Sequence, residues 1–504
     1  MALAVICASL LAGPPTATAA ADGCSPGSAS DFNGDGFADA VVADSTASVS
    51  GRSGAGRLIV FYGDSDGRIG EGARRVVQQG SGSVTDAPET GDRFGFALTA
   101  ADLDCDDFTD LVVGSPYEDA GGTDSGLVQI IWGTATGLGT GRGSRALNPA
   151  TFGNVAHAGD QFGYAVDALE DVGQGGTPAP TAYALAIGAP GWDVGSQRDA
   201  GWVGFQVAYD GGNEQLEVTQ DSPGIPGAAE SGDRFGAAVS LGYLLGDRGT
   251  VDAAVSTPHE DIGSRADAGA VTVVRDLYFD PVGVAYDQNS PGVPGAVEAG
   301  DRFGRTLDTV KVGLTSRLAV GVPGEDIGSA ADAGSVQLFS GNGSSLTPGV
   351  GLSQNTAGVT GVAESGDLFG DRLVFAPPGS GDPATRLAVS APRENGSRAD
   401  SGLVQVFPVT DLDAETTWSQ GSTGVPGGVD PGDRFGAALA FVSGQAERAL
   451  IVGVPDDVDN PSGMVNVIGV RTGGHRAWVP GVGGVPSGGS RFGDSLASAG
   501  NPGT

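Results

Sequence analysis

Gly91-Asp92-Arg93-Phe94-Gly95 spells GDRFG, a stretch that occurs four times in the chain, at 91–95, 232–236, 300–304 and 432–436. Close variants are GDQFG at 159–163, GDLFG at 366–370 and SRFGD at 490–494. The phenylalanines of the seven copies are separated by 57 to 73 residues and are Phe94, Phe162, Phe235, Phe303, Phe369, Phe435 and Phe492. A regular period of this size predicts a repeat architecture.

Each complete unit contains four short β-branched segments separated by glycine, proline, aspartate and serine. In the unit that starts at Phe94, the first segment is followed by LVVGSP at 111–116 and LVQIIWG at 127–133, and a weaker fourth segment precedes the next motif. Short strands with such turn signals are typical of all-β proteins. Four strands in a unit predict a propeller blade, and the sequence as a whole predicts a seven-bladed β-propeller.

The two ends of the chain complement each other in this pattern. The N-terminal unit starts at Asp31 and lacks an FG segment, whereas the C-terminus ends with an FG segment that starts at Phe492. We therefore predict a composite blade from 31–90 and 490–499, and six further blades that begin near 91, 159, 232, 300, 366 and 432. Such pairing closes the ring and removes the open sheet edge that would favour aggregation.

The charge balance narrows the class of partner. The chain of 504 residues has 61 acidic and 26 basic residues, for a net charge of −35. This charge disfavours nucleic acid and anionic membrane surfaces as partners, and it favours cations or basic partners. No segment after the N-terminal region is a candidate membrane span.

The N-terminal region has the pattern of a secretory signal. An apolar run of about ten residues is followed by small residues with A-x-A spacing, such as Ala17-Thr18-Ala19. We expect a signal peptide over 1–21 and a secreted bacterial protein that begins at 22, and a buried strand is the alternative. Export would leave Cys24 and Cys105 in an oxidising compartment, where a disulfide between them is expected and two unpaired buried thiols are the alternative.

The chain resembles the FG-GAP repeat family, which includes the N-terminal β-propeller of integrin α subunits. The resemblance rests on the FG segment, on a D-x-N-x-D-G-x-x-D loop, and on a second strand that ends in Gly188-Ala189-Pro190. It covers nearly all of the chain after residue 21, although the other units read GSP, STP, GVP or SAP. The resemblance implies a role in adhesion.

Two loops between first and second strands, 31–39 and 102–110, have acidic residues at alternating positions and resemble the calcium loops of that family. Side-chain oxygens at positions 1, 3, 5 and 9 and a main-chain carbonyl at position 7 can surround one Ca²⁺. The predicted ligands are Asp31, Asn33, Asp35, Phe37 and Asp39 in the first loop, and Asp102, Asp104, Asp106, Phe108 and Asp110 in the second.

We expect two calcium ions, with the first site better formed because Gly36 stands at the sharp turn where the second loop has Asp107. An aspartate-rich turn without an ion is the alternative for both loops. The other five blades lack this ladder of acids.

The second-to-third loops and the blade connections share the face opposite the calcium loops, and they are acidic. In a structural interpretation, aspartate and glycine cap turns, and the Asp-Arg pair of GDRFG fixes each connection. In a functional one, the carboxylates attract cationic or hydroxyl-rich ligands. Because binding sites usually interrupt a repeat, the ligand-face candidates are the blade-specific Tyr117, Trp192, Asp193 and His259, with packing between blades as the alternative.

No catalytic residues are predicted. The three histidines lie in different units, and Gly63-Asp-Ser65-Asp-Gly67 does not precede a helix as a nucleophile elbow does. We expect a monomeric, non-catalytic binding or adhesion module for an extracellular protein or polysaccharide. An extracellular hydrolase or lyase acting on a polymer from the acidic face is the alternative, and a structural wall protein is a third possibility. Two carboxylates in one pocket without repeat counterparts would favour the enzyme.

Overall fold

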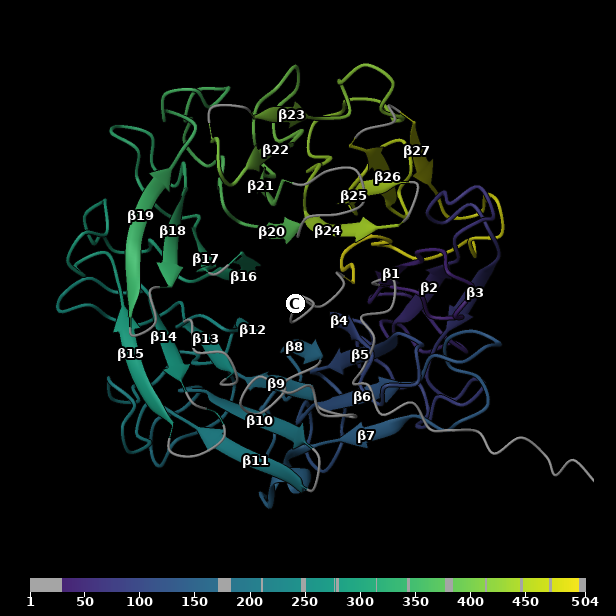
Figure 1. Cartoon of the computed structure of the whole chain (residues 1–504), viewed down its shortest axis with the longest axis horizontal. Coiled ribbons are helices and arrows are strands. Elements are labelled where there is room, and N and C mark those ends of the chain that lie inside the picture. The colour runs from purple at the N-terminus through teal and green to yellow at the C-terminus, as the bar shows by residue number, and fades with distance from the viewer. Residues whose placement is uncertain are drawn as a thin grey trace, which may run out of the picture.

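A computed structural model describes residues 30–170, 183–209, 212–245, 251–275, 277, 281–313, 315–341, 345–376, 384–412, 415–444, 447–470 and 474–497. The expected signal peptide at 1–21 and Cys24 lie outside these residues, so cleavage and the disulfide to Cys105 stay predictions. Seven antiparallel sheets surround a central axis in a ring (Figure 1). The predicted all-β seven-bladed propeller is confirmed, and no helix in the described ranges is long and apolar enough to cross a bilayer.

Blades are numbered along the chain, and within each one the strands follow in sequence order from the axis outward. Blade 1 contains β1 (Ala40–Asp44), β2 (Arg57–Phe61) and β3 (Arg74–Val77). Blades 2 and 3 contain β4 (Ala97–Ala101), β5 (Asp110–Ser115), β6 (Leu127–Ile131), β7 (Arg145–Leu147), β8 (Ala165–Glu170), β9 (Tyr183–Ala189), β10 (Trp202–Tyr209) and β11 (Gly212–Val218), with a 3-10 turn, η1 (Pro149–Phe152), between them.

Blades 4 to 7 repeat the same four-stranded order. Blades 4 and 5 contain β12 (Val239–Gly242), β13 (Asp252–Thr257), β14 (Ala270–Arg275), β15 (Val282–Tyr286), β16 (Thr306–Val312), β17 (Thr315–Val322), β18 (Ser335–Gly341) and β19 (Leu346–Leu352). Blades 6 and 7 contain β20 (Leu373–Ala376), β21 (Arg386–Ala391), β22 (Leu403–Pro408), β23 (Thr416–Trp418), β24 (Ala438–Ser443), β25 (Arg448–Val454), β26 (Met464–Gly469) and β27 (His475–Trp478).

The C-terminal segment completes blade 1. Val42 in β1 forms an antiparallel bridge with Leu496, and main-chain hydrogen bonds join Gly493 to Ala43 and Ala43 to Ser495. In Figure 1 the yellow C-terminal segment lies beside the purple β1, next to the axis. The first strand of blade 1 therefore comes from the far end of the sequence, as the pattern predicts, and the inner edge of β1 is paired.

The phenylalanine of the repeated motif joins each blade to the one before it. All seven of these phenylalanines are fully buried. Each main-chain N–H donates to the loop before the third strand of the preceding blade, as Phe94 does to Ala55 and Phe162 does to Ser125 at 2.9 and 3.0 Å. A glycine with positive φ, such as Gly126 at 89°, lies against this phenylalanine backbone, where a β-carbon would collide. The motif is thus a blade-to-blade contact, and its arginine adopts positive φ, 53° at Arg93.

The aspartate of the motif caps its own turn. The buried Asp233 accepts a hydrogen bond from the Glu230 main-chain N–H at 2.6 Å, and Asp301 does the same with Glu298. Among the described residues, no ion pair joins the aspartate and the arginine of one motif, so the expected Asp-Arg pair is wrong. The carboxylate is buried and used by the main chain, whereas the arginine beside it has other contacts, as Arg434 has with Asp456 and Arg93 with the Tyr117 ring.

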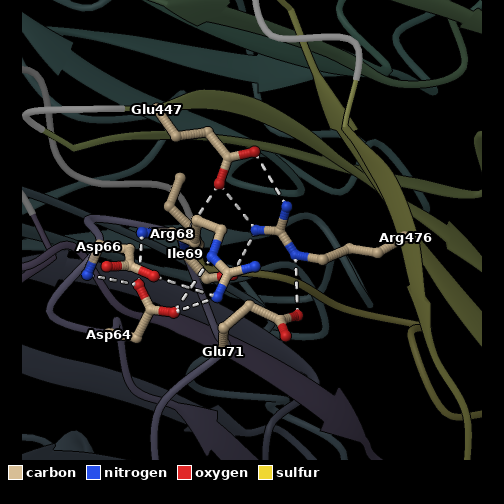
Figure 2. A network of polar contacts seen from close by, with 7 residues as sticks. All are labelled: Asp64, Asp66, Arg68, Ile69, Glu71, Glu447 and Arg476. Atoms are coloured by element: carbon tan, nitrogen blue, oxygen red, sulfur yellow. Dashed lines mark hydrogen bonds and ion pairs between the residues drawn. The ribbon is translucent and has the colours of Figure 1, made fainter.

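A polar clamp closes the ring between blade 7 and blade 1 (Figure 2). The two terminal guanidinium nitrogens of Arg476 in β27 donate to the carboxylate of Glu447, at 2.9 and 2.8 Å. Glu447 also accepts the Ile69 main-chain N–H at 3.1 Å, and Arg476 donates to the Ile69 carbonyl and pairs with Glu71 at 3.1 Å. The bidentate pair lies within blade 7, where Glu447 is buried, and the contacts of both side chains with Ile69 and of Arg476 with Glu71 join this blade to the composite one.

Candidate functional site

The second calcium loop brings three carboxylates together. Oxygen atoms of Asp102, Asp104 and Asp106 lie within 4.8 Å of one another. Burial, with the charges of Asp106 and Asp104, raises the pKa of Asp102 to about 6. The Oδ2 atom of Asp104 forms an ion pair with Arg142, whereas the Oδ1 atom of Asp104 is buried without a hydrogen-bond partner. A buried, unpartnered oxygen among three carboxylates fits a hard cation such as Ca²⁺.

The first loop has the same backbone arrangement with an amide in place of the middle carboxylate. Asp31 accepts main-chain hydrogen bonds from Gly34 at 2.7 Å and Gly36 at 2.7 Å, so the loop wraps around its carboxylate. Asn33 donates to Asp35 at 2.9 Å. These side chains fit a cation at positions 1, 3 and 5, and which of the two loops is better formed stays a prediction.

Position 6 has left-handed backbone in both loops. The φ angle is 85° at Gly36 and 68° at Asp107, and Cys105 at position 4 of the second loop also has positive φ, 55°. The sharp turn expected from Gly36 is therefore present in the second loop too, where aspartate adopts it.

The carboxylate at position 9 has a structural role in each loop. Asp39 accepts hydrogen bonds from the Phe32 and Gly63 main-chain N–H groups, both at 2.8 Å. Asp110 accepts from Leu103 at 3.0 Å and from Gly133 at 2.9 Å. Burial raises the pKa of Asp39 to about 8 and that of Asp110 well above its ordinary value.

The same anchor occurs in a blade that has no acidic ladder. Asp252, at the start of β13, accepts from the Leu245 main-chain N–H at 2.9 Å. The aspartate at position 9 thus anchors the loop to its blade whether or not a cation could bind there. In the second loop, the carboxylates that lie close together are those at positions 1, 3 and 5.

The two calcium loops touch each other. The Asp31 N–H donates to the Thr109 hydroxyl at 3.0 Å, and the Thr109 N–H donates to the Asp31 carbonyl at 2.9 Å. Gly34 lies directly against the ring of Phe108, where a β-carbon would collide. The inner strand β4 begins just after the GDRFG motif on one face of the ring and ends at the loop 102–110 on the other face. Loops 31–39 and 102–110 therefore lie on the face opposite the acidic second-to-third loops.

On the acidic face, five blade junctions share one buried amide–carboxyl contact. The side-chain amide at the end of one blade donates to an acid in the second-to-third loop of the next. The pairs are Gln79–Glu118, Gln220–Glu260, Gln288–Glu325, Gln354–Glu394 and Gln420–Asp457. Burial raises the pKa of Glu118 to about 8 and that of Glu325 to about 7. A contact that recurs at five junctions supports the structural interpretation of this acidic face.

The four ligand-face candidates lie in different surroundings. Trp192 stacks on Trp202 with ring centroids 5.5 Å apart, in the core between blades, which is the packing alternative. Asp193 accepts the Asp199 N–H at 3.0 Å, and His259 contacts Asp267 at 2.7 Å, so each belongs to its own loop. Tyr117 differs, because its ring contacts Phe96 near the axis with centroids 5.8 Å apart.

A cavity of about 670 Å³, the axial mouth, opens at the axis on the acidic face. The first two residues after each FG pair supply much of its wall. Members of the wall include Phe96, Tyr164, Ala237, Ala238, Arg305, Thr306, Arg372, Ala438, Asp494 and Ser495, together with Arg93 and Arg491 from the motif itself.

None of the four predicted ligand-face candidates lines the axial mouth. An alignment of the seven FG copies already shows the signal, because the residue after FG is aromatic in two copies, alanine in two, aspartate in two and arginine in one: Phe96, Tyr164, Ala237, Ala437, Asp371, Asp494 and Arg305. The repeat is thus interrupted at the position that surrounds the axis, which is where a repeat protein with one ligand would differ between units.

Below the axial mouth, the inner strands surround a smaller cavity of about 180 Å³ that contains Asp167 and Asp308. The corresponding positions in the other copies are Thr99, Ser240, Val374, Ala440 and Ala497, so neither carboxylate has an acidic counterpart. Asp167 accepts from the Leu241 N–H at 2.7 Å, and Asp308 accepts from the Phe375 N–H at 2.5 Å. Burial raises the pKa of Asp167 to about 6 and that of Asp308 to about 7.

A curated relative, phosphatidylinositol-glycan-specific phospholipase D of Dictyostelium discoideum, is 31% identical over 103 residues, which are 20% of this chain. The match spans only 10% of that protein's length.

Two solved structures are similar over most of the ring. An α-L-arabinofuranosidase, Arb93A of Fusarium graminearum, has a TM-score of 0.42 at 10% identity and covers 75% of this chain and 93% of its own. The periplasmic gluconolactonase PpgL of Pseudomonas aeruginosa has a TM-score of 0.42 at 15% identity and covers 90% and 98%. Neither similarity is close enough to bear on function.

The family comparison agrees with the repeated motif. Residues 94–131, from the first GDRFG phenylalanine to the end of β6, match the family model described as the FG-GAP repeat. The matched segment covers three strands of blade 2, and the other six copies of the motif make the same contact between blades. Residues 94–131 therefore form an FG-GAP repeat within a seven-bladed β-propeller, which is consistent with an FG-GAP repeat β-propeller protein.

Proposed function

We propose that the protein is a secreted, calcium-stabilised binding module that recognises an extracellular protein or glycan at the axial mouth without chemical turnover. The observation that carries this proposal is the interruption of the repeat around the axis. Six FG copies keep a glycine, an aspartate and a phenylalanine for contact between blades, while the residues just after FG vary in charge and size. A cavity of about 670 Å³ is within the range of small-ligand sites.

Calcium has a supporting role in this proposal. Asp31, Asn33 and Asp35 in one loop, and Asp102, Asp104 and Asp106 in the other, would hold the ions, with the Phe37 and Phe108 carbonyls as further ligands. Bound calcium would neutralise carboxylates that repel one another, and it would stiffen two adjoining loops far from the axial mouth.

The test is direct binding with matched variants. The calcium-loaded chain is applied to arrays of glycans and of matrix and wall proteins, alongside Phe96→Ala and the control Arg198→Gln, whose exposed side chain does not line the axial mouth. We expect a ligand whose binding is lost in Phe96→Ala and kept in Arg198→Gln. A ligand bound equally by both variants would show that recognition occurs elsewhere.

A hydrolase or lyase is the second candidate, because Asp167 and Asp308 are two carboxylates in one cavity without acidic repeat counterparts. Their raised pKa values suit acid-base chemistry near neutral pH. Against this role, each accepts a main-chain hydrogen bond from the next blade, which gives it a structural use. The test is release of reducing or unsaturated ends from polysaccharides by the wild type and by Asp308→Asn. Turnover that is lost in Asp308→Asn, in a variant that stays folded, would favour the enzyme over the binding module.

A further inference from the structure

The axial mouth has two chemically different walls. The residues after FG are aromatic in blades 2 and 3, where the rings of Phe96 and Tyr164 lie with centroids 4.9 Å apart. They include arginine in blades 5 and 6, at Arg305 and Arg372. Blade 4 separates the two walls on one side with the small residues Ala237 and Ala238. The order of blades around the ring therefore places an aromatic wall and a cationic wall on opposite sides of one cavity.

The cationic wall is poorly neutralised by the protein itself. Among the described residues, Arg305 has neither an ion pair nor a side-chain hydrogen bond. Arg372 pairs with Asp371 at 3.0 Å, and Arg491 pairs with Asp456 at 2.5 Å, but Asp456 is shared with Arg434. The guanidinium group of Arg93 lies 5.0 Å from the centroid of Tyr117 and not on a carboxylate.

One carboxylate, that of Asp494, lines the axial mouth, and it already accepts hydrogen bonds from the protein itself. Asp494 accepts hydrogen bonds from the Ser45 hydroxyl at 2.5 Å and from the Ser45 N–H at 3.2 Å. Four arginines line the cavity with a single aspartate, and although Arg372 and Arg491 are paired with Asp371 and Asp456, the arginines still outnumber these three acids in a chain whose net charge is −35. This local reversal of sign points to an anionic ligand group, and a free guanidinium can bind a carboxylate through two parallel hydrogen bonds.

The surroundings limit the size and charge of the ligand. The acidic second-to-third loops encircle the axial mouth, so a polyanion that extended past the rim would lie against carboxylates. A ligand with one negative charge and a compact ring avoids this repulsion. Its ring can contact the half-buried faces of Phe96 and Tyr164 while its charge reaches Arg305 and Arg372.

We propose that the axial mouth binds a carboxylate-bearing sugar, either free or at the end of a glycan chain, with Arg305 and Arg372 on the carboxylate and Phe96 and Tyr164 against the ring. This inference rests on the proposed binding function and specifies its ligand class. A sugar acid combines the two features that the walls require, because its ring has an apolar C–H face and its carboxylate matches the guanidinium fork.

The test is isothermal titration of the calcium-loaded full chain with glucuronate and galacturonate, and with their neutral parents glucose and galactose. Uronate-terminated oligosaccharides distinguish a chain end from a free sugar, and glucose 6-sulfate tests whether any anion suffices. We expect the uronates to bind about tenfold to a hundredfold more tightly than the neutral sugars, the range for a hydrogen bond to a charged group. Equal affinity for acidic and neutral sugars, or tighter binding of the sulfate than of the uronates, would overturn the ligand class.

Substitutions in each wall test whether the cationic wall binds the carboxylate and the aromatic wall binds the sugar ring. Arg305→Gln should reduce uronate affinity by about tenfold or more without changing the affinity for neutral sugars, and Arg305→Lys should restore part of it. Phe96→Ala should weaken every sugar that binds, and Arg198→Gln should weaken none. Because the Arg305 side chain has no partner within the described structure, its replacement should leave the melting temperature unchanged. Unchanged uronate affinity in Arg305→Gln would show that the cationic wall is not the receptor.

The outcome also separates this inference from the proposed function. If a neutral glycan or a protein binds, and Phe96→Ala abolishes that binding while the uronates do not bind, the axial mouth is a binding site and the sugar-acid assignment is wrong. If no ligand on the arrays depends on Phe96 or Arg305, the binding function at the axial mouth is itself wrong.

Discussion

Val42 in the first strand of the chain is paired with Leu496, near its end, in an antiparallel bridge that completes blade 1. The neighbouring Phe492 is fully buried, and its ring lies 6.3 Å from that of Phe61 in β2. The stability of the whole ring thus depends on a segment that contributes only one inner strand.

Replacing Phe492 by alanine should destabilise the protein by about 3 to 5 kcal/mol, the usual cost of removing a buried phenylalanine side chain. Urea unfolding followed by tryptophan fluorescence measures the change. Val482→Ala serves as the control, because Val482 is 63% exposed in the connection just before this segment. A Phe492→Ala protein as stable as Val482→Ala would contradict closure by the C-terminal segment.

The clamp between Arg476 and Glu447 should be the most sensitive polar contact at the closing junction. Arg476→Ala leaves the buried Glu447 carboxylate without its bidentate partner, and loss of one member of a buried pair costs about 3 to 5 kcal/mol. The double variant Arg476→Leu, Glu447→Leu should lose less than the single variant, because it removes the buried Glu447 charge together with its partner and leaves only the more exposed Glu71 without Arg476. Thermal unfolding compares the variants, with Arg68→Ala as a control at a largely exposed ion pair in the same network. Equal losses for Arg476→Ala and Arg68→Ala would contradict a special role of the clamp.

Removal of calcium should lower the melting temperature. At free calcium about a hundred times the dissociation constant, each site would add about 2.7 kcal/mol to the free energy of unfolding. EDTA should remove this stabilisation, Asp35→Ala should abolish one site, and Asp106→Ala should abolish the other. Metal analysis should give two ions for the wild type and one for each variant.

Because the loops touch at Asp31 and Thr109, we expect loss of one ion to weaken binding of the second. The exposed Asp66→Ala is the control for a change in charge alone. A melting temperature that EDTA leaves unchanged would rule out calcium in both loops.

The acidic face should make the protein less stable as the pH rises from about 5 to 8. The pKa of Glu118 is about 8 in the folded protein, and the pKa values of Asp233, Asp301, Glu325 and Asp367 are about 7, all raised by burial above the ordinary values of 3.8 or 4.5. The folded chain therefore holds protons that the unfolded chain has already released in this range, so the free energy of unfolding falls with pH. The stabilisation that these carboxyl groups contribute is fully present below their pKa values in the unfolded chain. It is lost as the pH rises through their pKa values in the folded protein.

The Gln79–Glu118 contact offers a way to check this cause. A protonated Glu118 can donate to Gln79 Oε1, which is buried and otherwise lacks a hydrogen-bond partner. Glu118→Gln should keep the contact and reduce the pH dependence of the melting temperature, measured from pH 5 to 8 at fixed ionic strength. Asp66→Asn, at an exposed site, should leave that dependence as it is in the wild type. Stability that rises with pH would contradict the sign of these shifts.

The sequence was sufficient for the architecture because each blade repeats its own local signals. The FG phenylalanine and the glycine before the third strand make the same contact seven times, and the capping aspartate recurs in six copies, so their period gives the number of blades. The two incomplete ends indicated the composite blade for the same reason. The acidic loops 31–39 and 102–110 could also be found in the sequence, since the acids of each loop lie within nine residues of each other, and calcium in them stays a prediction.

The sequence could not determine what the blades form together at the axis. Phe96, Tyr164, Arg305 and Arg372 lie in four different repeats, and no local pattern relates them until the ring closes and brings them to one cavity. The same is true of Asp167 and Asp308, and of the glutamine that reaches an acid in the next blade. The expected Asp-Arg pair is wrong because adjacency along the chain does not determine where two side chains point: the aspartate turns inward to the main chain, while the arginine contacts other groups, such as Asp456 at Arg434. Local hydrogen bonding and burial thus specified each blade, whereas the charge and shape of the candidate ligand site were decided by tertiary closure alone.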